Sequence, residues 1–182
     1  MAKVERKTTY FAKPGPANTK DVIDAVADRV KEGGIKTVVV ASTSGSTGVK
    51  FASAFKGKVK VLAVSHEKMD PKFKDRIVKL GGIAIDGTHL PLHKRNMDKM
   101  RNTLYILGQG FKVAVEVALI AVDKGILKPY EDVIAVAGTD RGSDTALVLR
   151  ATSTKEIFDR DHSKRLAVKE VIAMPLDKRW WD

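Results

Sequence analysis

The sequence predicts one α/β domain in three layers, α/β/α, with a mixed, mostly parallel sheet between two layers of helices. Three observations predict this fold class. Short, continuously apolar segments alternate with longer segments in which apolar residues recur at helical spacing. Glycine pairs close two of the helical segments, as is typical of helix C-termini. No linker, low-complexity tract or internal repeat divides the chain, so we assign residues 1–182 to a single domain.

The helices are expected from their end signals and their spacing. Asn18 and Thr19 are typical of an N-cap, and Asp70 with Pro71 marks a second helix start. Gly125 ends the last helix. Four helices are expected: the first over residues 19–32, the second burying Val49, Ala52 and Phe55, the third over residues 71–80, and the fourth over about 111–124.

The strands are expected where short apolar runs lie between these helices. Buried strands are expected over residues 37–41, 59–64, 83–85, 133–137 and 146–149, with residues 166–174 as a sixth candidate. Because strands and helices alternate, the sheet should be largely parallel and its crossovers right-handed.

Composition excludes several classes of protein. The chain has no cysteine, which excludes disulfides, thiolate metal sites and a cysteine nucleophile. No apolar run approaches the roughly 20 residues that span a bilayer. The N-terminus, MAKVERKTTY, lacks the apolar core of a signal peptide. We therefore expect a cytoplasmic protein with no membrane partner.

The net charge of +11 raises the question of nucleic acid. Between Lys50 and Leu80, nine lysines and arginines stand against three acids, so six of the eleven net charges fall there. They are spread over two expected helices and a strand, and no aromatic series interleaves with them, as a base-stacking surface requires. A solvated face is favoured, and a nucleic-acid-binding module stays an unlikely alternative.

The strongest functional signal is the segment STSGSTG, residues 42–48, between a buried strand and a helix. In open α/β sheets, ligands bind beyond the carboxyl ends of the strands. A helix N-terminus there offers backbone N–H groups and the positive end of its dipole to an anion. The spacing matches neither a Walker loop nor G-x-G-x-x-G, and an ordinary polar turn with a serine cap is the alternative. The residues predicted to bind phosphate are Thr43, Ser44, Gly45, Ser46 and Thr47.

A second segment, GTDRGSDT, follows the expected strand 133–137. Arg141 can bind a phosphate with two parallel hydrogen bonds, and glycines on either side leave room for it. The alternative is a hairpin-like turn in which Asp140 and Asp144 bond to their own backbone. Two such loops at strand ends favour one shared site, to which we assign Gly138, Thr139, Asp140, Arg141 and Gly142.

Three further candidates follow the second and third expected strands. His66 comes just after residues 59–64, and Gly87 and Thr88 come after residues 83–85. All three would lie on the ligand edge of the sheet, although a surface turn is the alternative for His66. We include them among the predicted binding residues.

Histidines 89 and 93 have the spacing of a helical metal pair, but Pro91 lies between them and no acid stands at ligand spacing. We therefore expect no metal site and treat this segment as a loop or lid over the ligand site. The segments GQG (108–110) and KPGPANT (13–19) are weaker candidates for contact with the ligand. Trp180 and Trp181 are expected to contact a partner or a second copy.

Two stretches resemble the C-terminal α/β domain of pyruvate kinase: IKTVVVASTSGSTGVKFASAFKGKVKVLAVSHEKMDPKFKDRIVKLGGIAI and GILKPYEDVIAVAGTDRGSDTALVLRA. The likeness covers about residues 35–150 and is closer still to archaeal proteins that consist of this domain alone. It implies a sheet of strand order 3-2-1-4-5 with the last strand antiparallel, so that the two glycine loops face each other. In pyruvate kinases activated by sugar bisphosphates, these loops hold the effector's phosphates. The positions that carry over are Thr43, Ser44, Gly45, Ser46 and Thr47, with Arg141 and Gly142.

The departures from that family also matter. The catalytic barrel is missing, so pyruvate kinase activity is not expected. Thr139 and Asp140 replace the usual tryptophan and proline of the second loop, which argues against the same sugar effector. For the stand-alone family, the resemblance implies flavin mononucleotide (FMN) as the ligand, and it allows a homodimer.

The sequence therefore predicts a domain that binds a phosphorylated small molecule, with FMN implied by resemblance. One alternative is an enzyme acting on a phosphorylated metabolite, with Asp140, His66 or His89 as acid or base. The other is the nucleic-acid module described above. The sequence does not decide whether a reaction is catalysed.

Overall fold

The computed structural model describes residues 3–180, whose strands all belong to one seven-stranded sheet of order β1-β7-β6-β5-β2-β3-β4. The strands are β1 (Thr9–Phe11), β2 (Thr37–Ala41), β3 (Lys60–Val64), β4 (Ile83–Ile85), β5 (Asp132–Ala137), β6 (Thr145–Arg150) and β7 (Ala167–Pro175). The strands from β4 to β6 have the expected order 3-2-1-4-5, with β2 as the first of the five. The expected mixed α/β fold is confirmed.

Strand directions follow the expected pattern in the centre of the sheet. β2 is parallel to both β3 and β5, and β3 is parallel to β4. β6 is antiparallel to β5, and β7 is antiparallel to β6. The carboxyl ends of β2, β3 and β5 therefore lie at the same edge of the sheet, which is where ligands bind in such folds.

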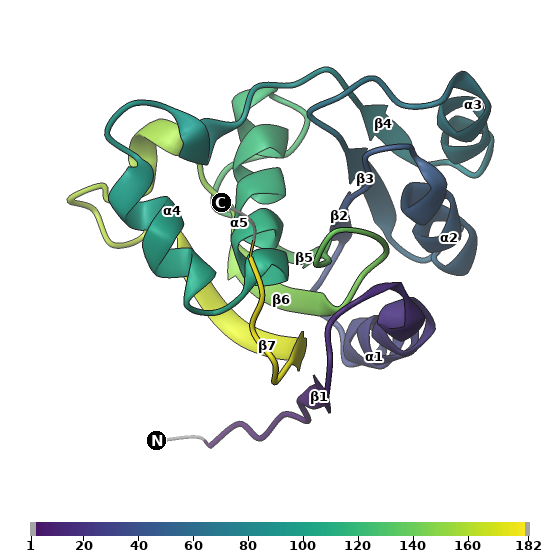
Figure 1. Ribbon diagram of the computed structural model, residues 1–182, viewed down its shortest axis with the longest axis horizontal. Helices are drawn as coiled ribbons and strands as arrows, with labels where there is room; N and C mark the ends of the chain where they lie inside the picture. Colours follow the sequence, from purple (N-terminus) through teal and green to yellow (C-terminus); the bar gives the residue numbers. More distant parts are fainter. Residues whose placement is uncertain (1–2, 181–182) are drawn as a thin grey trace.

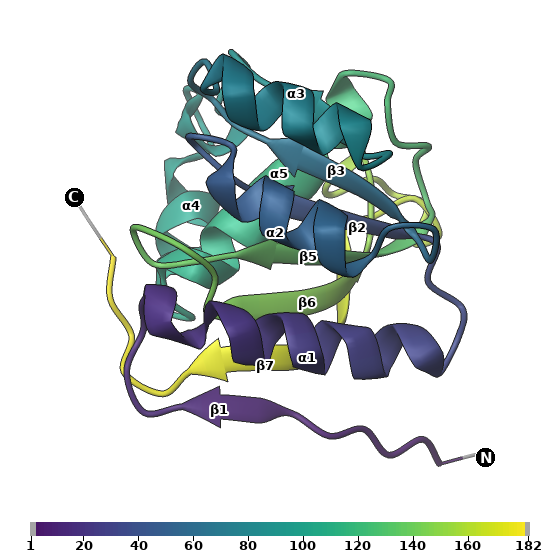
Figure 2. The same cartoon turned by 90° about the vertical axis from the view of Figure 1, so that its right-hand side faces the viewer.

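Helices cover both faces of the sheet (Figures 1 and 2). The helices are α1 (Thr19–Lys31), α2 (Ser46–Ala54), α3 (Pro71–Lys79), α4 (Asp98–Tyr105) and α5 (Gln109–Asp123), with short 3-10 turns η1 (Pro16–Asn18), η2 (Pro91–His93) and η3 (Thr154–Glu156). α1, α2 and α3 lie on one face, and α4 and α5 lie on the other. Along β2, Val39 packs into the α5 core, whereas Val38 and Val40 pack into the core under α1–α3. This alternation explains why β2 is apolar at every position after Thr37.

Two elements were not expected. β1 has only three residues and pairs with the end of β7, with Thr9 opposite Ala173. A three-residue edge strand is too short to show a period in the sequence. α4 buries none of its residues fully, and only Met100 and Leu104 pack against the α5 core, so its apolar pattern is weak.

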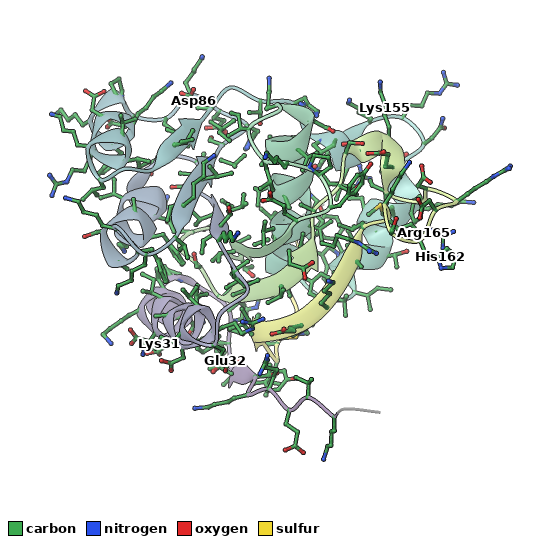
Figure 3. All side chains as sticks on the ribbon, turned by 180° about the vertical axis from the view of Figure 1, so that it is seen from behind. Lys31, Glu32, Asp86, Lys155, His162 and Arg165 are labelled. Carbon is green, nitrogen blue, oxygen red and sulfur yellow. The ribbon has the colours of Figure 1, made fainter. Side chains whose placement is uncertain are left out.

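Figure 3 labels charged residues at several places on the molecule: Lys31 and Glu32 lie together at the end of α1, and Asp86 lies just after β4. The basic residues between Lys50 and Lys79 lie on α2, on α3 and around β3, and Lys74 pairs with Asp86 at 2.8 Å. Within residues 3–180, no helix is long and apolar enough to cross a membrane.

Candidate functional site

A cavity of about 1550 Å³ lies at the carboxyl ends of β2, β3 and β5. Two walls of different character line it. We call the first the loop wall: it consists of the β2–α2 loop (residues 42–45) with the first residues of α2, residues 65–68 after β3, and the β5–β6 loop (138–144). We call the second the helix wall: it consists of residues on η2, α4 and α5, together with Trp180. The cavity exceeds the roughly 300–1000 Å³ that is usual for small-molecule pockets.

The β2–α2 loop turns the chain from the sheet into α2. Gly45 is the N-cap of α2 with φ of 97°, a left-handed conformation that favours glycine. Ser42 Oγ accepts a hydrogen bond from the Gly48 N–H at 2.9 Å, which fixes the first turn of the helix. The N–H of Ser46 donates to Ser44 Oγ at 3.3 Å. The loop therefore satisfies part of the helix N-terminus from its own side chains.

The remaining N–H groups of this turn are free. Within the part of the chain that the structure describes, no hydrogen bond uses the backbone N–H groups of Thr43, Ser44, Gly45 or Thr47. Such groups at a helix N-terminus form an anion site together with the helix dipole. The loop therefore has the chemistry to bind a phosphate or another anion.

The β5–β6 loop is a hairpin loop whose shape depends on Asp144. This side chain is fully buried and accepts hydrogen bonds from the Thr139 N–H at 2.9 Å, the Gly15 N–H at 3.0 Å and Thr145 Oγ1 at 2.8 Å. The part of the alternative turn that involves Asp144 is therefore present, whereas within the described residues no hydrogen bond uses the Asp140 carboxylate. It does not exclude ligand binding, because Arg141 in the same loop lines the cavity.

Glycines in the β5–β6 loop allow close backbone packing. A Cβ on Gly138 would lie 2.5 Å from the carbonyl oxygen of Gly142. Gly142 has φ of 70°, and a Cβ there would lie 2.5 Å from Thr19 Oγ1. Thr19 Oγ1 accepts from the Ser143 N–H at 3.0 Å, so the start of α1 supports this loop from behind.

The helix wall holds a charged cluster in which Lys112 and Glu116 are buried and His93 is exposed. Lys112 Nζ lies 2.7 Å from Glu116 Oε2 and 2.8 Å from His93 Nε2. Glu116 Oε1 accepts from the Leu92 N–H at 3.0 Å. The two α5 residues are only 3% and 2% exposed. Partial burial of the imidazole and the positive charge of Lys112 lower the pKa of His93 from its ordinary 6.5.

Two aromatic side chains extend the helix wall. Tyr105 at the end of α4 stacks on Trp180, with ring centroids 6.5 Å apart and planes 15° apart. The Gln109 N–H donates to the Arg179 carbonyl at 2.8 Å, which holds the C-terminal segment against the start of α5. Val113, Val117 and other apolar residues complete a surface suited to a planar ring.

Most of the predicted binding residues line this cavity. They are Thr43, Ser44, Ser46, Thr47, His66, Gly138, Asp140, Arg141 and Gly142. The structure thus brings together both glycine loops and the residue after β3.

Four predicted binding residues are not among those that line the cavity. At Gly45, an added Cβ would point away from the cavity, 2.7 Å from Phe73 of α3. Thr88 is buried and donates to the Ser65 carbonyl at 3.0 Å. Thr139 is buried, and its Oγ1 has no partner within the described residues. The Gly87 N–H donates to the Glu67 carbonyl at 2.9 Å, which makes it part of a turn.

The weaker candidates divide between the cavity and the scaffold. Gln109 of the GQG segment lines the cavity, as do Leu90 and His93 from the expected loop or lid, which is partly helical. His89 instead lies 3.1 Å from Asp123 and is not among the lining residues. The segment 13–19 supports the β5–β6 loop from outside the cavity. Of the two C-terminal tryptophans, Trp181 lies outside the described residues.

Sequence reasoning missed the charged cluster. Its signal was present: Lys112 and Glu116 stand four residues apart in an otherwise apolar helix, which places both on one face. A charged pair inside a helix that is apolar all round must be paired and commonly faces a site. Among residues 3–180, no group of three or more His, Cys, Asp or Glu is placed to hold a metal ion.

Comparison with known families gives one match. The family model described as the alpha/beta domain of pyruvate kinase matches residues 20–149. The matched range includes both glycine loops and the whole of α4 and α5, whereas β1, β7 and the C-terminal segment lie outside it.

Proposed function

Since this chain belongs to the pyruvate kinase alpha/beta domain family, we propose that it binds a phosphorylated small molecule, FMN, across the β2–α2 and β5–β6 loops. One observation carries the proposal: two loops from distant parts of the sequence line a single cavity, and one of them is a helix N-terminus with unused N–H groups. These are the features of a phosphate site.

The loop wall would hold the phosphate. The N–H groups of the β2–α2 loop and the hydroxyls of Ser44 and Ser46 would donate hydrogen bonds, and the α2 dipole would favour the negative charge. Arg141 from the opposite loop would add a charge-assisted pair. Lys68, which also lines the cavity, would add positive charge.

The helix wall fits the other end of FMN. Tyr105, Trp180 and the apolar side chains of α5 form a surface for a flat ring system, and the cavity is large enough to contain both ends of the ligand. A bound flavin would supply hydride or single-electron transfer. The residues of the chain would bind the ligand, orient it and limit its contact with water.

The proposal is tested by calorimetric titration of FMN into the protein and into the Arg141→Ala variant. We expect the wild type to bind and the variant to bind about tenfold more weakly or worse, because a hydrogen bond to a charged group contributes roughly 1.5–3 kcal/mol. Lys36→Ala is the matched control: it removes one positive charge just before β2, at the opposite edge of the sheet. Wild-type protein that binds no FMN, or equal affinity in all three proteins, would overturn the proposal.

A further inference from the structure

We propose that Lys112 is a ligand-binding residue, and that it donates an ammonium N–H to a carbonyl or anionic oxygen at the ring end of the cavity's ligand. This inference rests on the proposed function and adds to it. It names a second polar contact, on the wall opposite the phosphate loops, and the chemical group that makes it.

The hydrogen-bond inventory of the cluster carries the argument. A lysine ammonium has three N–H donors. Two of them point at Glu116 Oε2 and His93 Nε2, which leaves one donor. Each carboxylate oxygen of Glu116 already accepts one hydrogen bond, Oε2 from Lys112 and Oε1 from the Leu92 N–H. The cluster therefore has an unused ammonium N–H, whereas each of its carboxylate oxygens already has a donor.

The charge of the cluster points the same way. Because the pKa of His93 is lowered, the imidazole is neutral near pH 7, and its Nε2 accepts a hydrogen bond from the Lys112 ammonium. The face of Tyr105 lies 5.6 Å from Lys112 Nζ, close enough to attract a cation. Glu116 and His93 are positioning residues: they accept hydrogen bonds from the ammonium and hold it in place.

The energetics favour a functional reason for the cluster. Burying two ions costs several kcal/mol each before their attraction is counted, and well-packed apolar residues often serve stability as well or better. The residues next to and between the pair along α5 are all apolar, and the charges nevertheless lie on the cavity wall; these residues are Phe111, Val113, Ala114, Val115 and Val117. A ligand oxygen would use the spare donor that the fold leaves there.

The chemistry of the ligand's ring end follows from this donor. It must present an acceptor, such as a carbonyl of a cyclic imide or urea, or the oxygen of an enolate. The pyrimidine part of a flavin has such carbonyl oxygens, and so do other heterocycles of the same kind.

A crossed binding experiment separates the two ends of the ligand. The probes are FMN, riboflavin (the same ring without phosphate) and inorganic phosphate. The variants are Arg141→Ala for the loop wall and the double variant Lys112→Met with Glu116→Gln for the helix wall. The double variant leaves no unpaired buried ion and keeps an acceptor for the Leu92 N–H.

We expect the double variant to bind FMN and riboflavin about tenfold more weakly and to bind phosphate within about twofold of wild type. Arg141→Ala should weaken the binding of FMN and of phosphate but leave the affinity for riboflavin unchanged. Lys124→Met, at the far end of α5 and exposed, is the matched control and should change none of the three affinities. Thermal unfolding of each variant checks that it folds.

The single variant Glu116→Gln gives a prediction of opposite sign. It removes the negative charge but leaves Lys112, so the affinity for FMN should rise or hold rather than fall. If the cluster served only to stabilise the fold, both Glu116→Gln and the double variant would bind FMN more weakly than wild type.

The inference is overturned if the double variant binds FMN and riboflavin as tightly as wild type does. It is also overturned if the affinity of the double variant for phosphate falls by the same factor as its affinity for FMN. Failure of the proposed function looks different, because then wild-type protein itself binds none of the three probes.

Discussion

The two walls of the cavity present different chemical groups to a ligand. The loop wall offers mainly backbone N–H groups at strand ends and a helix N-terminus, and its shape is set by glycines and by one buried carboxylate, Asp144. The helix wall offers side chains: an aromatic pair and the ion cluster of Lys112, Glu116 and His93. The loop wall should therefore be sensitive to changes that move the backbone, and the helix wall to changes of charge.

The largest effect is expected on the helix wall. Lys112→Met alone leaves Glu116 buried without its counter-ion, which should lower the free energy of unfolding by about 3–5 kcal/mol. Urea unfolding measures this change. The double variant with Glu116→Gln should recover most of the loss, and Lys124→Met should stay within about 0.5 kcal/mol of wild type. A single variant as stable as the double variant would show that the two charges are not coupled.

The next effect is expected on the loop wall. Asp144→Ala removes the acceptor for two backbone N–H groups, those of Thr139 and Gly15. Leaving such donors unsatisfied should cost about 3 kcal/mol in urea unfolding, because each costs about 1–3 kcal/mol. Phosphate affinity should fall with it, since the loop that carries Arg141 loses its support.

Asp140→Asn is the control for Asp144, because asparagine also tolerates the left-handed backbone (φ of 69°) that this residue adopts. Asp140 is an acid of the same loop, but it is exposed, and removing its charge should change stability by less than about 0.5 kcal/mol. If both variants lost the same stability, Asp144 would not organise the loop wall as described.

The smallest effect is a pH dependence from His93. Its pKa is lowered in the folded protein, so the unfolded chain takes up a proton first as the pH falls. Partial burial of the imidazole is the largest cause of the lowered pKa; Lys112, Arg101 and His66 also act to lower it, and Glu116 acts to raise it. The stabilising contribution should be present above about pH 6.5 and be lost as the pH falls through the folded pKa.

Thermal unfolding of wild type and His93→Gln between pH 5 and 8 measures the contribution. The difference in stability between the two proteins should shrink as the pH is lowered. A difference that grows at low pH would mean that the cluster stabilises charged His93 instead.

The loop wall was largely predictable, because its signals are local. STSGSTG and GTDRGSDT each follow an apolar strand, and strand ends of a parallel sheet meet at one edge. Sequence could not tell which way each residue faces. At Gly45 the missing side chain points at Phe73, and Thr88 is used to bond the Ser65 carbonyl.

The helix wall could not be predicted from the sequence, because tertiary packing brings its residues together. His93 stands nineteen residues before Lys112 and meets it only when η2 packs beside α5. Trp180 reaches Tyr105 through the C-terminal segment after β7, where the Arg179 carbonyl accepts from the Gln109 N–H at the start of α5. Only the pair Lys112 and Glu116, two charges in an apolar helix, could have been noticed from the sequence.

The most direct measurement is an absorbance spectrum of freshly purified protein, followed by mass spectrometry of the small molecules released on denaturation. A ligand that spans both walls should carry a phosphate at one end and an acceptor-bearing ring at the other. We predict a flavin spectrum and release of FMN from wild type, with less or none from Arg141→Ala and from the Lys112→Met, Glu116→Gln double variant. Colourless wild-type protein that releases no phosphorylated compound, and that binds no added FMN, would contradict the central claim.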